Sequence, residues 1–167
     1  MNNEFLQKAK DKLITQGLDD FANQVEFSYN YTRNKAVSNR DKHFTMQKRI
    51  LSVSICVNIA NILTALFSSL QVCSHGIAIV TAISSILSIF VTALVTMKDN
   101  KSYCETWLRH QAHQAAMEFE IIEYVSGCGN YQSGSSSNNA KAFQNAMLAI
   151  WKKNQDNFNT NMAHFNK

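Results

Sequence analysis

The sequence contains no proline and only five glycines. Proline is the residue that most reliably ends a helix, so long stretches of this chain hold nothing that would interrupt one. Gly17 follows a short amphipathic segment, Gly76 lies inside an apolar run, and the other three glycines fall in the segment SGCGNYQSGSSSNN, residues 126–139. The sequence therefore predicts an all-α protein in which these glycines mark the boundaries of long helices.

Charge is absent from residues 50–97, which contain no Asp, Glu, Lys or Arg. A soluble helix of that length would need charged residues every turn or two, which excludes an ordinary globular core. About 20 apolar residues cross a bilayer as a helix, so we predict two membrane spans at about 50–71 and 77–97. The short linker VCSHG between them predicts an antiparallel transmembrane hairpin. An all-α membrane protein is the expected fold class.

Basic residues indicate the orientation of this hairpin. Lys and Arg precede the first span and follow the second, whereas the linker has neither. The positive-inside rule then places both termini in the cytoplasm. The expected organisation is N-terminal cytoplasmic helices, the hairpin, a cytoplasmic helix with a loop, and a C-terminal amphipathic cytoplasmic helix, at residues 1–49, 50–97, 98–132 and 140–167.

Residues on both sides of the hairpin are expected to continue it as long cytoplasmic helices. A mostly apolar stripe recurs at steps of three and four after the second span, at Tyr103, Trp107, His110, Gln114, Met117, Ile121 and Tyr124. A similar stripe follows the glycine-rich segment, at Phe143, Met147, Ile150, Asn154, Phe158 and Phe165. This spacing predicts that each helix has one face packed against another element.

The four cysteines have no paired spacing, so a disulfide framework is not expected. Cys104, His110, His113 and Cys128 match no standard zinc pattern, and we expect neither a metal nor a cofactor. No nucleophile–base set, glycine-rich phosphate loop or carboxylate pair stands out, so the chain is not expected to be an enzyme. The first apolar run begins only at Ile50, so no cleavable signal peptide is expected.

The first span carries polar residues on one face. Ser54, Asn58, Asn61 and Ser68 recur at helical spacing, and the second span has a matching stripe of Ser and Thr. Hydroxyl groups can bond back to their own helix, but an amide cannot readily do so and is costly in lipid. Two interpretations stay open: a water-filled path lined by these four residues, or a dry cluster of interhelical hydrogen bonds. A pore would require several copies of the hairpin, and our working hypothesis is a homotetramer.

A basic segment precedes the first span, and Arg33, Lys35, Arg40 and Lys42 lie far enough from the predicted membrane to meet a ligand. They are candidate residues for binding a phosphate-bearing ligand. The alternative is that they serve only as a topology signal and contact anionic lipid headgroups.

The segment after the second span carries a further pattern: a Trp and an Arg close to the membrane, a Glu-bearing helix, a Tyr, and a Gly-x-Tyr ending. The matching residues are Trp107, Arg109, Glu118 or Glu120, Tyr124, Gly129 and Tyr131. This order, with the basic segment before the hairpin, resembles the SLATT family of small bacterial two-span membrane proteins. The resemblance covers roughly residues 20–132.

That resemblance implies a pore-forming effector of anti-phage defence in the bacterial inner membrane. Such an effector depolarises or permeabilises the host membrane and causes growth arrest or cell death. It is controlled by a nucleotide or oligonucleotide that a partner nucleotidyltransferase makes. Two other classes stay open: a membrane scaffold whose cytoplasmic helices bind a protein partner, and an unregulated lytic toxin. The long polar segments argue against the toxin, because simple lysis does not need them.

Overall fold

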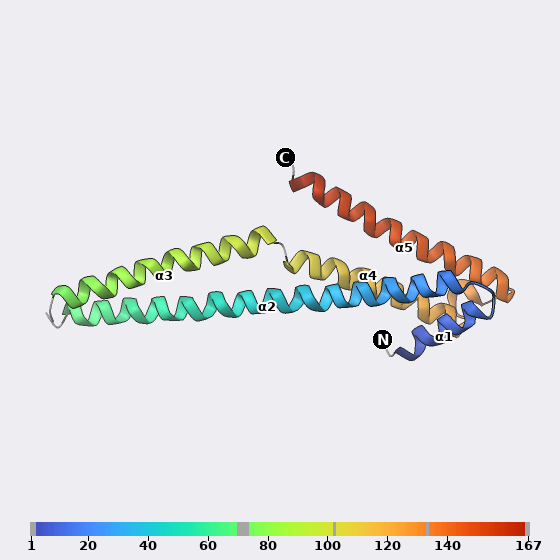
Figure 1. Cartoon of the computed structure of the whole chain (residues 1–167), viewed down its shortest axis with the longest axis horizontal. Helices are drawn as coiled ribbons and strands as arrows, with labels where there is room; N and C mark the ends of the chain where they lie inside the picture. The colour runs from blue at the N-terminus through green and yellow to red at the C-terminus, as the bar shows by residue number, and fades with distance from the viewer. Residues whose placement is uncertain (1–2, 70–73, 102, 133, 166–167) are drawn as a thin grey trace. The chain divides into compact units, whose positions relative to one another are not determined.

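The computed structural model describes residues 3–69, 74–101, 103–132 and 134–165. These residues form α-helices and one short 3-10 helix, and no strand occurs among them (Figure 1). The elements in chain order are α1 (Asn3–Ile14), α2 (Asp19–Ser69), α3 (Ser74–Lys101), α4 (Tyr103–Ser126), η1 (Gly129–Tyr131) and α5 (Ser136–Phe165). The all-α prediction is confirmed.

Two helix starts differ from the sequence prediction. α5 begins at Ser136 rather than near residue 140, because the Ser135 side chain accepts a hydrogen bond from the Asn138 amide at 3.3 Å and caps the first turn. α3 begins at Ser74, so Gly76 lies in its first turn instead of separating the spans. Much of the predicted linker is therefore helical.

Other predicted boundaries fall on residues outside the described ranges. α3 ends at Lys101 and α4 begins at Tyr103, so the point where the second span was expected to continue as a cytoplasmic helix includes residue 102, which lies outside the described ranges. The predicted spans lie within α2 and α3, apart from residues 70 and 71, which are also outside the described ranges.

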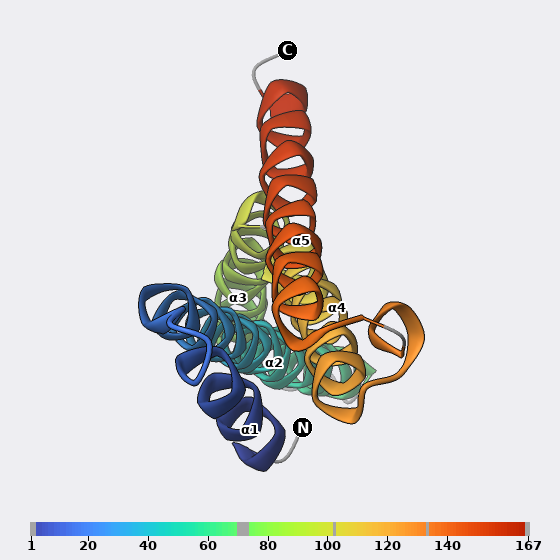
Figure 2. The ribbon, with the colours of Figure 1, turned by 90° about the vertical axis from the view of Figure 1, so that its right-hand side faces the viewer.

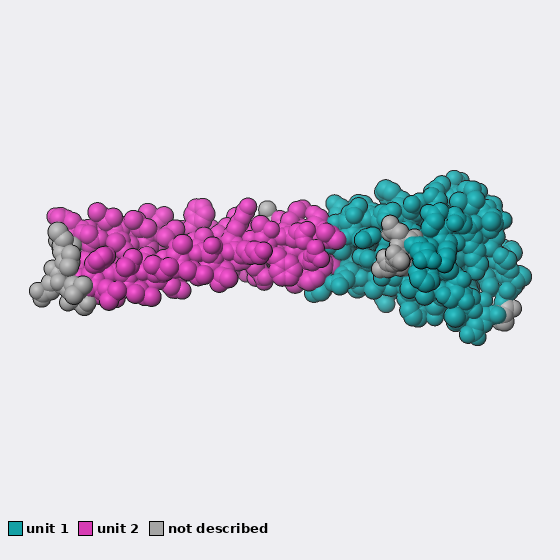
Figure 3. Space-filling view, turned by 90° about the horizontal axis from the view of Figure 1, so that it is seen from below, with its two compact units in different colours: residues 1–36, 108–167 teal, residues 37–107 magenta. Residues whose placement is uncertain are grey.

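The chain divides into two compact units, coloured separately in Figure 3. Unit 1 comprises residues 1–36 and 108–167, and unit 2 comprises residues 37–107. Unit 1 therefore contains α1, the beginning of α2, most of α4, and α5. Unit 2 contains the remainder of α2, all of α3 and the beginning of α4.

Unit 1 has a hydrophobic core to which its four helices contribute (Figure 2). Each helix supplies three buried residues at steps of three and four, which places them on one face. These residues are Leu6, Ala9 and Leu13 from α1; Ala22, Val25 and Tyr29 from α2; Met117, Ile121 and Tyr124 from α4; and Ala140, Phe143 and Met147 from α5. The last three residues of the stripe predicted for α4 and the first two of the stripe predicted for α5 thus lie in this core.

Tyr124 connects several elements of unit 1. Its ring stacks on Phe143 of α5 with a centroid distance of 4.4 Å, and it meets Tyr131 of η1 edge-on at 5.4 Å. Lys12 of α1 donates a hydrogen bond to the Tyr124 carbonyl at 2.9 Å, and its ammonium lies 4.5 Å from the ring centroid. A cation at the last turn of α4 also complements the negative end of the helix dipole.

In unit 2, α2 and α3 lie side by side and antiparallel (Figure 1). The face of α3 that is least exposed follows steps of three and four, at Ile77, Val80, Ser84, Leu87, Val91 and Leu94. This is the spacing of helices packed in the manner of a coiled coil.

The outward faces of the two helices are strongly apolar. Large exposed side chains include Leu51, Ile55, Ile59 and Ile62 on α2, and Ile79, Ile83, Ile86 and Phe90 on α3. Both helices are long and apolar enough to cross a membrane, yet only 0% and 6% of the residues in their most apolar 18-residue stretches are buried. This surface is therefore not buried by the described part of the chain, and a membrane or another apolar surface would cover it.

Candidate functional site

A polar groove with a volume of about 470 Å³ lies between α2 and α3 of unit 2. Its polar lining comes from both helices: Asn61, Thr64 and Ser68 on α2, and Thr81, Ser84, Ser85 and Ser88 on α3. The groove therefore places uncharged amide and hydroxyl groups within the otherwise apolar hairpin.

Asn61 and Ser84 form the direct link between the two helices in this groove. The Ser84 hydroxyl donates to the Asn61 side-chain carbonyl at 2.5 Å, and Ser84 is only 6% exposed. Asn61 itself is exposed. Its amide nitrogen carries two further N–H donors, which need water or another protein chain if the hairpin lies in lipid.

Five other hydroxyl groups of α3 bond to their own helix. Each donates to the carbonyl four residues earlier: Thr81 to Ile77, Ser85 to Thr81, Ser88 to Ser84, Thr92 to Ser88, and Thr96 to Thr92. The expectation that these hydroxyls can satisfy themselves locally is confirmed. The Asn61 amide cannot readily satisfy all of its donors and acceptors in this way, so it is the group that distinguishes the groove from simple helix packing.

The structure divides the predicted pore-lining residues into two pairs. Asn61 and Ser68 line the groove, whereas Ser54 and Asn58 do not. Ser54 is half-buried and lies about two turns before Asn61, and Asn58 is exposed and turned about 60° from Asn61 around the helix. The sequence periodicity predicted a shared face, but only part of that face meets the groove within one chain.

The predicted ligand-binding residues Arg33, Lys35, Arg40 and Lys42 all lie on α2 and are exposed. Lys35 lies over the ring of Tyr31 at 5.4 Å, and Arg40 pairs with the adjacent Asp41 at 3.0 Å. In an α-helix, positions 33 and 40 share one side, while 35 and 42 share nearly the opposite side. One chain therefore does not bring the four cations together.

Glu118 from the family-like pattern connects α4 to α2 in unit 1. It accepts hydrogen bonds from Tyr29 at 2.6 Å and from Gln114 at 2.9 Å. Burial alone would raise the pKa of Glu118, but these hydrogen bonds lower it, and the pKa lies below its ordinary value. Burial and the bond to Glu118 raise the pKa of Tyr29 to about 12. The matched Glu is therefore a structural link between helices.

The Gly-x-Tyr ending also has a structural role. The Tyr131 hydroxyl bonds to Glu120, and Tyr131 is buried in the core of unit 1. Gly127 and Gly129 have φ of +65° and +59°, a left-handed backbone that favours glycine. They reverse the chain after α4, and so carry Tyr131 back onto the helix that precedes it.

Trp107 is part of an aromatic cluster in unit 2. Its ring centroid lies 6.0 Å from that of Phe44 and 6.4 Å from that of His43, both on α2. His43 is buried, with 8% of its surface exposed. The cluster holds the beginning of α4 against α2 on the polar side of the predicted hairpin.

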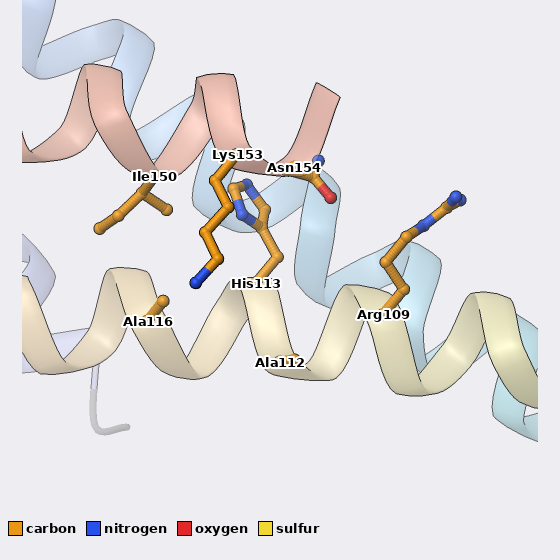
Figure 4. Close-up of a pocket in the computed structure, with 7 residues that line it drawn as sticks. All are labelled: Arg109, Ala112, His113, Ala116, Ile150, Lys153 and Asn154. Carbon is orange, nitrogen blue, oxygen red and sulfur yellow. The ribbon is translucent and has the colours of Figure 1, made fainter. Parts of the chain in front are cut away.

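A pocket that the sequence did not reveal lies between α4 and α5 in unit 1, with a volume of about 300 Å³ (Figure 4). Arg109, Ala112, His113 and Ala116 line it from α4, and Ile150, Lys153 and Asn154 line it from α5. Figure 4 shows Lys153 extending from α5 toward α4 beside His113. Burial lowers the pKa of His113, so its imidazole is neutral at pH 7 and the pocket's positive charge comes from Arg109 and Lys153.

Within the described part of the chain, no group of three His, Cys, Asp or Glu side chains lies close enough to hold a metal ion. Cys104 is half-buried and Cys128 is exposed after α4, while His110 and His113 line pockets of unit 1.

Residues 28–139 match the family model described as a protein of unknown function, DUF4231. No curated protein and no solved structure matches the chain. The matched region includes α3 and α4, most of α2, and the first residues of α5.

Proposed function

The chain belongs to the DUF4231 family, and we propose that it is a non-enzymatic, pore-forming membrane effector of the SLATT type. In this proposal α2 and α3 cross the bacterial inner membrane as a hairpin, and both termini lie in the cytoplasm. The exposed apolar faces of the two helices and their lengths support a membrane location. The basic residues that precede the first span and follow the second support the orientation.

The observation that carries the pore proposal is the Asn61–Ser84 pair within the polar groove. The bond from Ser84 uses only the side-chain oxygen of Asn61, whose amide is exposed. In lipid the rest of that amide needs a polar partner, and so do the open polar walls of the groove. Copies of the hairpin arranged around an axis would supply that partner and would enclose water.

Several copies are needed because one hairpin has too few helices to surround a channel. A closed ring of identical subunits is the simplest arrangement, and a tetramer is the working form. A lining of amides and hydroxyls without charge would conduct ions with little preference for their sign. The result of opening would be membrane depolarisation, followed by growth arrest or cell death.

A cytoplasmic ligand would control the opening. The resemblance of the pattern from Trp107 to Tyr131 favours a nucleotide or oligonucleotide made by a partner nucleotidyltransferase in antiviral defence. Arg33, Lys35, Arg40 and Lys42 lie on two sides of α2, so they could meet one ligand only between neighbouring subunits. The alternative role of these cations, contact with anionic headgroups, remains their second candidate function.

The test is conductance in planar bilayers with the purified full-length protein, together with its mass in detergent. We expect discrete current steps and a homo-oligomer. A monomer that gives no current would overturn the pore proposal and would favour a scaffold that binds a protein partner. Current with no oligomer larger than a dimer would contradict the ring.

A further inference from the structure

Two pockets of unit 1 meet at shared residues. The pocket between α4 and α5 described above contains Arg109 and Lys153. A second pocket of about 380 Å³ lies against α2, and both pockets include His113 and Asn154. All of these residues belong to unit 1, and the two pockets adjoin at His113 and Asn154.

The second pocket is aromatic. Trp151 from α5 and Phe27 and Tyr31 from α2 line it. Phe27 and Tyr31 are exposed, and their rings stack on one another with a centroid distance of 6.2 Å. Aromatic faces of this kind bind flat rings by stacking.

Two side chains that line the aromatic pocket, Trp151 and His110, each carry a buried polar atom with no partner among the described residues. The Trp151 Nε1–H group and the His110 Nδ1 atom are buried without a hydrogen bond to the described residues. Buried polar groups in folded proteins are nearly always paired, so two such atoms on side chains that line one pocket indicate a missing polar partner. Burial and the nearby charge of Arg109 lower the pKa of His110, which keeps its imidazole neutral at pH 7.

The first pocket has the opposite character. Lys153 and Arg109 supply two positive charges whose charged ends point away from one another (Figure 4), Asn154 supplies an amide, and none of the described residues that line the pocket is acidic. Guanidinium and ammonium groups in a recess are the usual partners of phosphate. The two volumes, about 300 and 380 Å³, lie at the lower end of the range of small-molecule sites.

We propose that these adjoining pockets form a binding site for a nucleotide, with the base against Trp151 and the phosphate against Lys153. The unpaired Trp151 and His110 atoms would bond to polar atoms on the edge of the base. The proposal rests on the proposed function in one respect, that this ligand is the one that controls the pore. In this proposal the controlling ligand binds between α2, α4 and α5, and not at the basic segment of α2.

The experiment measures binding in detergent, without any current. Trp107 and Trp151 are the two tryptophans of the chain, so a Trp107→Phe background leaves Trp151 as the only tryptophan emitter. The probes are cyclic AMP, cyclic di-AMP, adenosine and ribose 5-phosphate. We expect saturable quenching of Trp151 emission by a nucleotide, with weaker binding of adenosine and ribose 5-phosphate because each fills only one pocket.

Lys153→Met and Lys152→Met form a matched pair, since both lysines are exposed neighbours on α5 but only Lys153 lines the pocket. Lys153→Met should weaken nucleotide binding about tenfold, whereas Lys152→Met should leave it nearly unchanged. The circular dichroism of both variants should match the parent. Equal effects of the two substitutions, or no quenching by any of the four probes, would overturn the site.

The outcome separates the two proposals. Conductance from a protein that binds no nucleotide would reject this site and leave the pore standing. Nucleotide binding that depends on Lys153, in a protein that never conducts, would support the site and reject the pore.

Discussion

Tyr29 of α2 donates its hydroxyl hydrogen to Glu118 of α4 across 2.6 Å, and so joins two helices that are distant in sequence. Tyr29 is almost completely buried, with 1% of its surface exposed, and Gln114 bonds to the same carboxylate oxygen. The two helices that hold this pair also carry residues of the proposed nucleotide site, Tyr31 and Arg109. The pair therefore fixes the register of the elements that form that site.

Substitution of Tyr29 by Phe should destabilise unit 1 by about 1–2 kcal/mol, because it removes a hydrogen bond to a charged group and leaves Glu118 with fewer partners. Faster hydrogen–deuterium exchange in α4 of the full-length protein in detergent would show the loss. Tyr31→Phe is the matched control, since Tyr31 is half exposed on the same helix. Similar exchange in the two variants would show that the Tyr29–Glu118 bond contributes little.

The same bond predicts a dependence of stability on pH. The pKa of Glu118 is lower in the folded state than in an unfolded chain, so its contribution is present above the unfolded value, near 4.5. That contribution disappears as the pH falls through the lowered pKa of the folded state. Melting temperatures should therefore fall more steeply below pH 4.5 in the native protein than in Tyr29→Phe. Parallel curves for the two proteins would contradict the assignment.

Lys12 and Lys8 provide a second matched pair, on α1. Lys12 bonds to the Tyr124 carbonyl and lies over its ring, whereas Lys8 forms an exposed pair with Glu4. Lys12→Met should cost about 1–2 kcal/mol, and Lys8→Met less than about 0.5 kcal/mol. Denaturant unfolding, followed by exchange at the end of α4, measures both. A larger loss for Lys8→Met would show that α1 is not anchored through Tyr124.

Much of the helical organisation could be predicted from sequence because it follows local rules. Without proline, the helices extend until glycine ends them, as Gly127 shows after α4, and a polar capping residue marks where a helix begins, as Ser135 shows before α5. The stripe that ends at Ile121 and Tyr124 predicted a packed face, and those residues are buried in the core of unit 1. The helical spacing of apolar residues was enough to predict this packed face.

The sites were harder to predict because they depend on which faces meet. The helical spacing of the polar residues placed Asn58 and Asn61 on one face of the first span, but only Asn61 bonds to Ser84 on the neighbouring helix. Arg109 and Lys153 line one pocket because α5 packs on α4, a pairing that no local pattern encodes. Lys153, two positions after Trp151, was the one available signal in the sequence, and it lies outside the basic segment that precedes the first span.

The Asn61–Ser84 pair gives the sharpest test of the proposed pore, because substitutions of its two residues should have different effects on the current and on the stability of the hairpin. Asn61→Leu removes the exposed amide and makes that wall of the groove apolar, which favours loss of water from a channel. Ser84→Ala removes the interhelical bond, which is worth about 0.6–2 kcal/mol in a membrane, and leaves the Asn61 amide in place.

In a water-filled pore, Asn61→Leu should therefore abolish most of the current while the oligomer persists, and Ser84→Ala should keep a current from a less stable hairpin. Asn58→Leu is the control on the same helix, since Asn58 lies outside the groove. Current in bilayers and mass in detergent distinguish the cases. Loss of water from the lining would reduce the current without separating the subunits. If Asn61→Leu instead separates the subunits, the amide serves assembly. If Asn61→Leu conducts like the native protein, the amide is not essential to the pore.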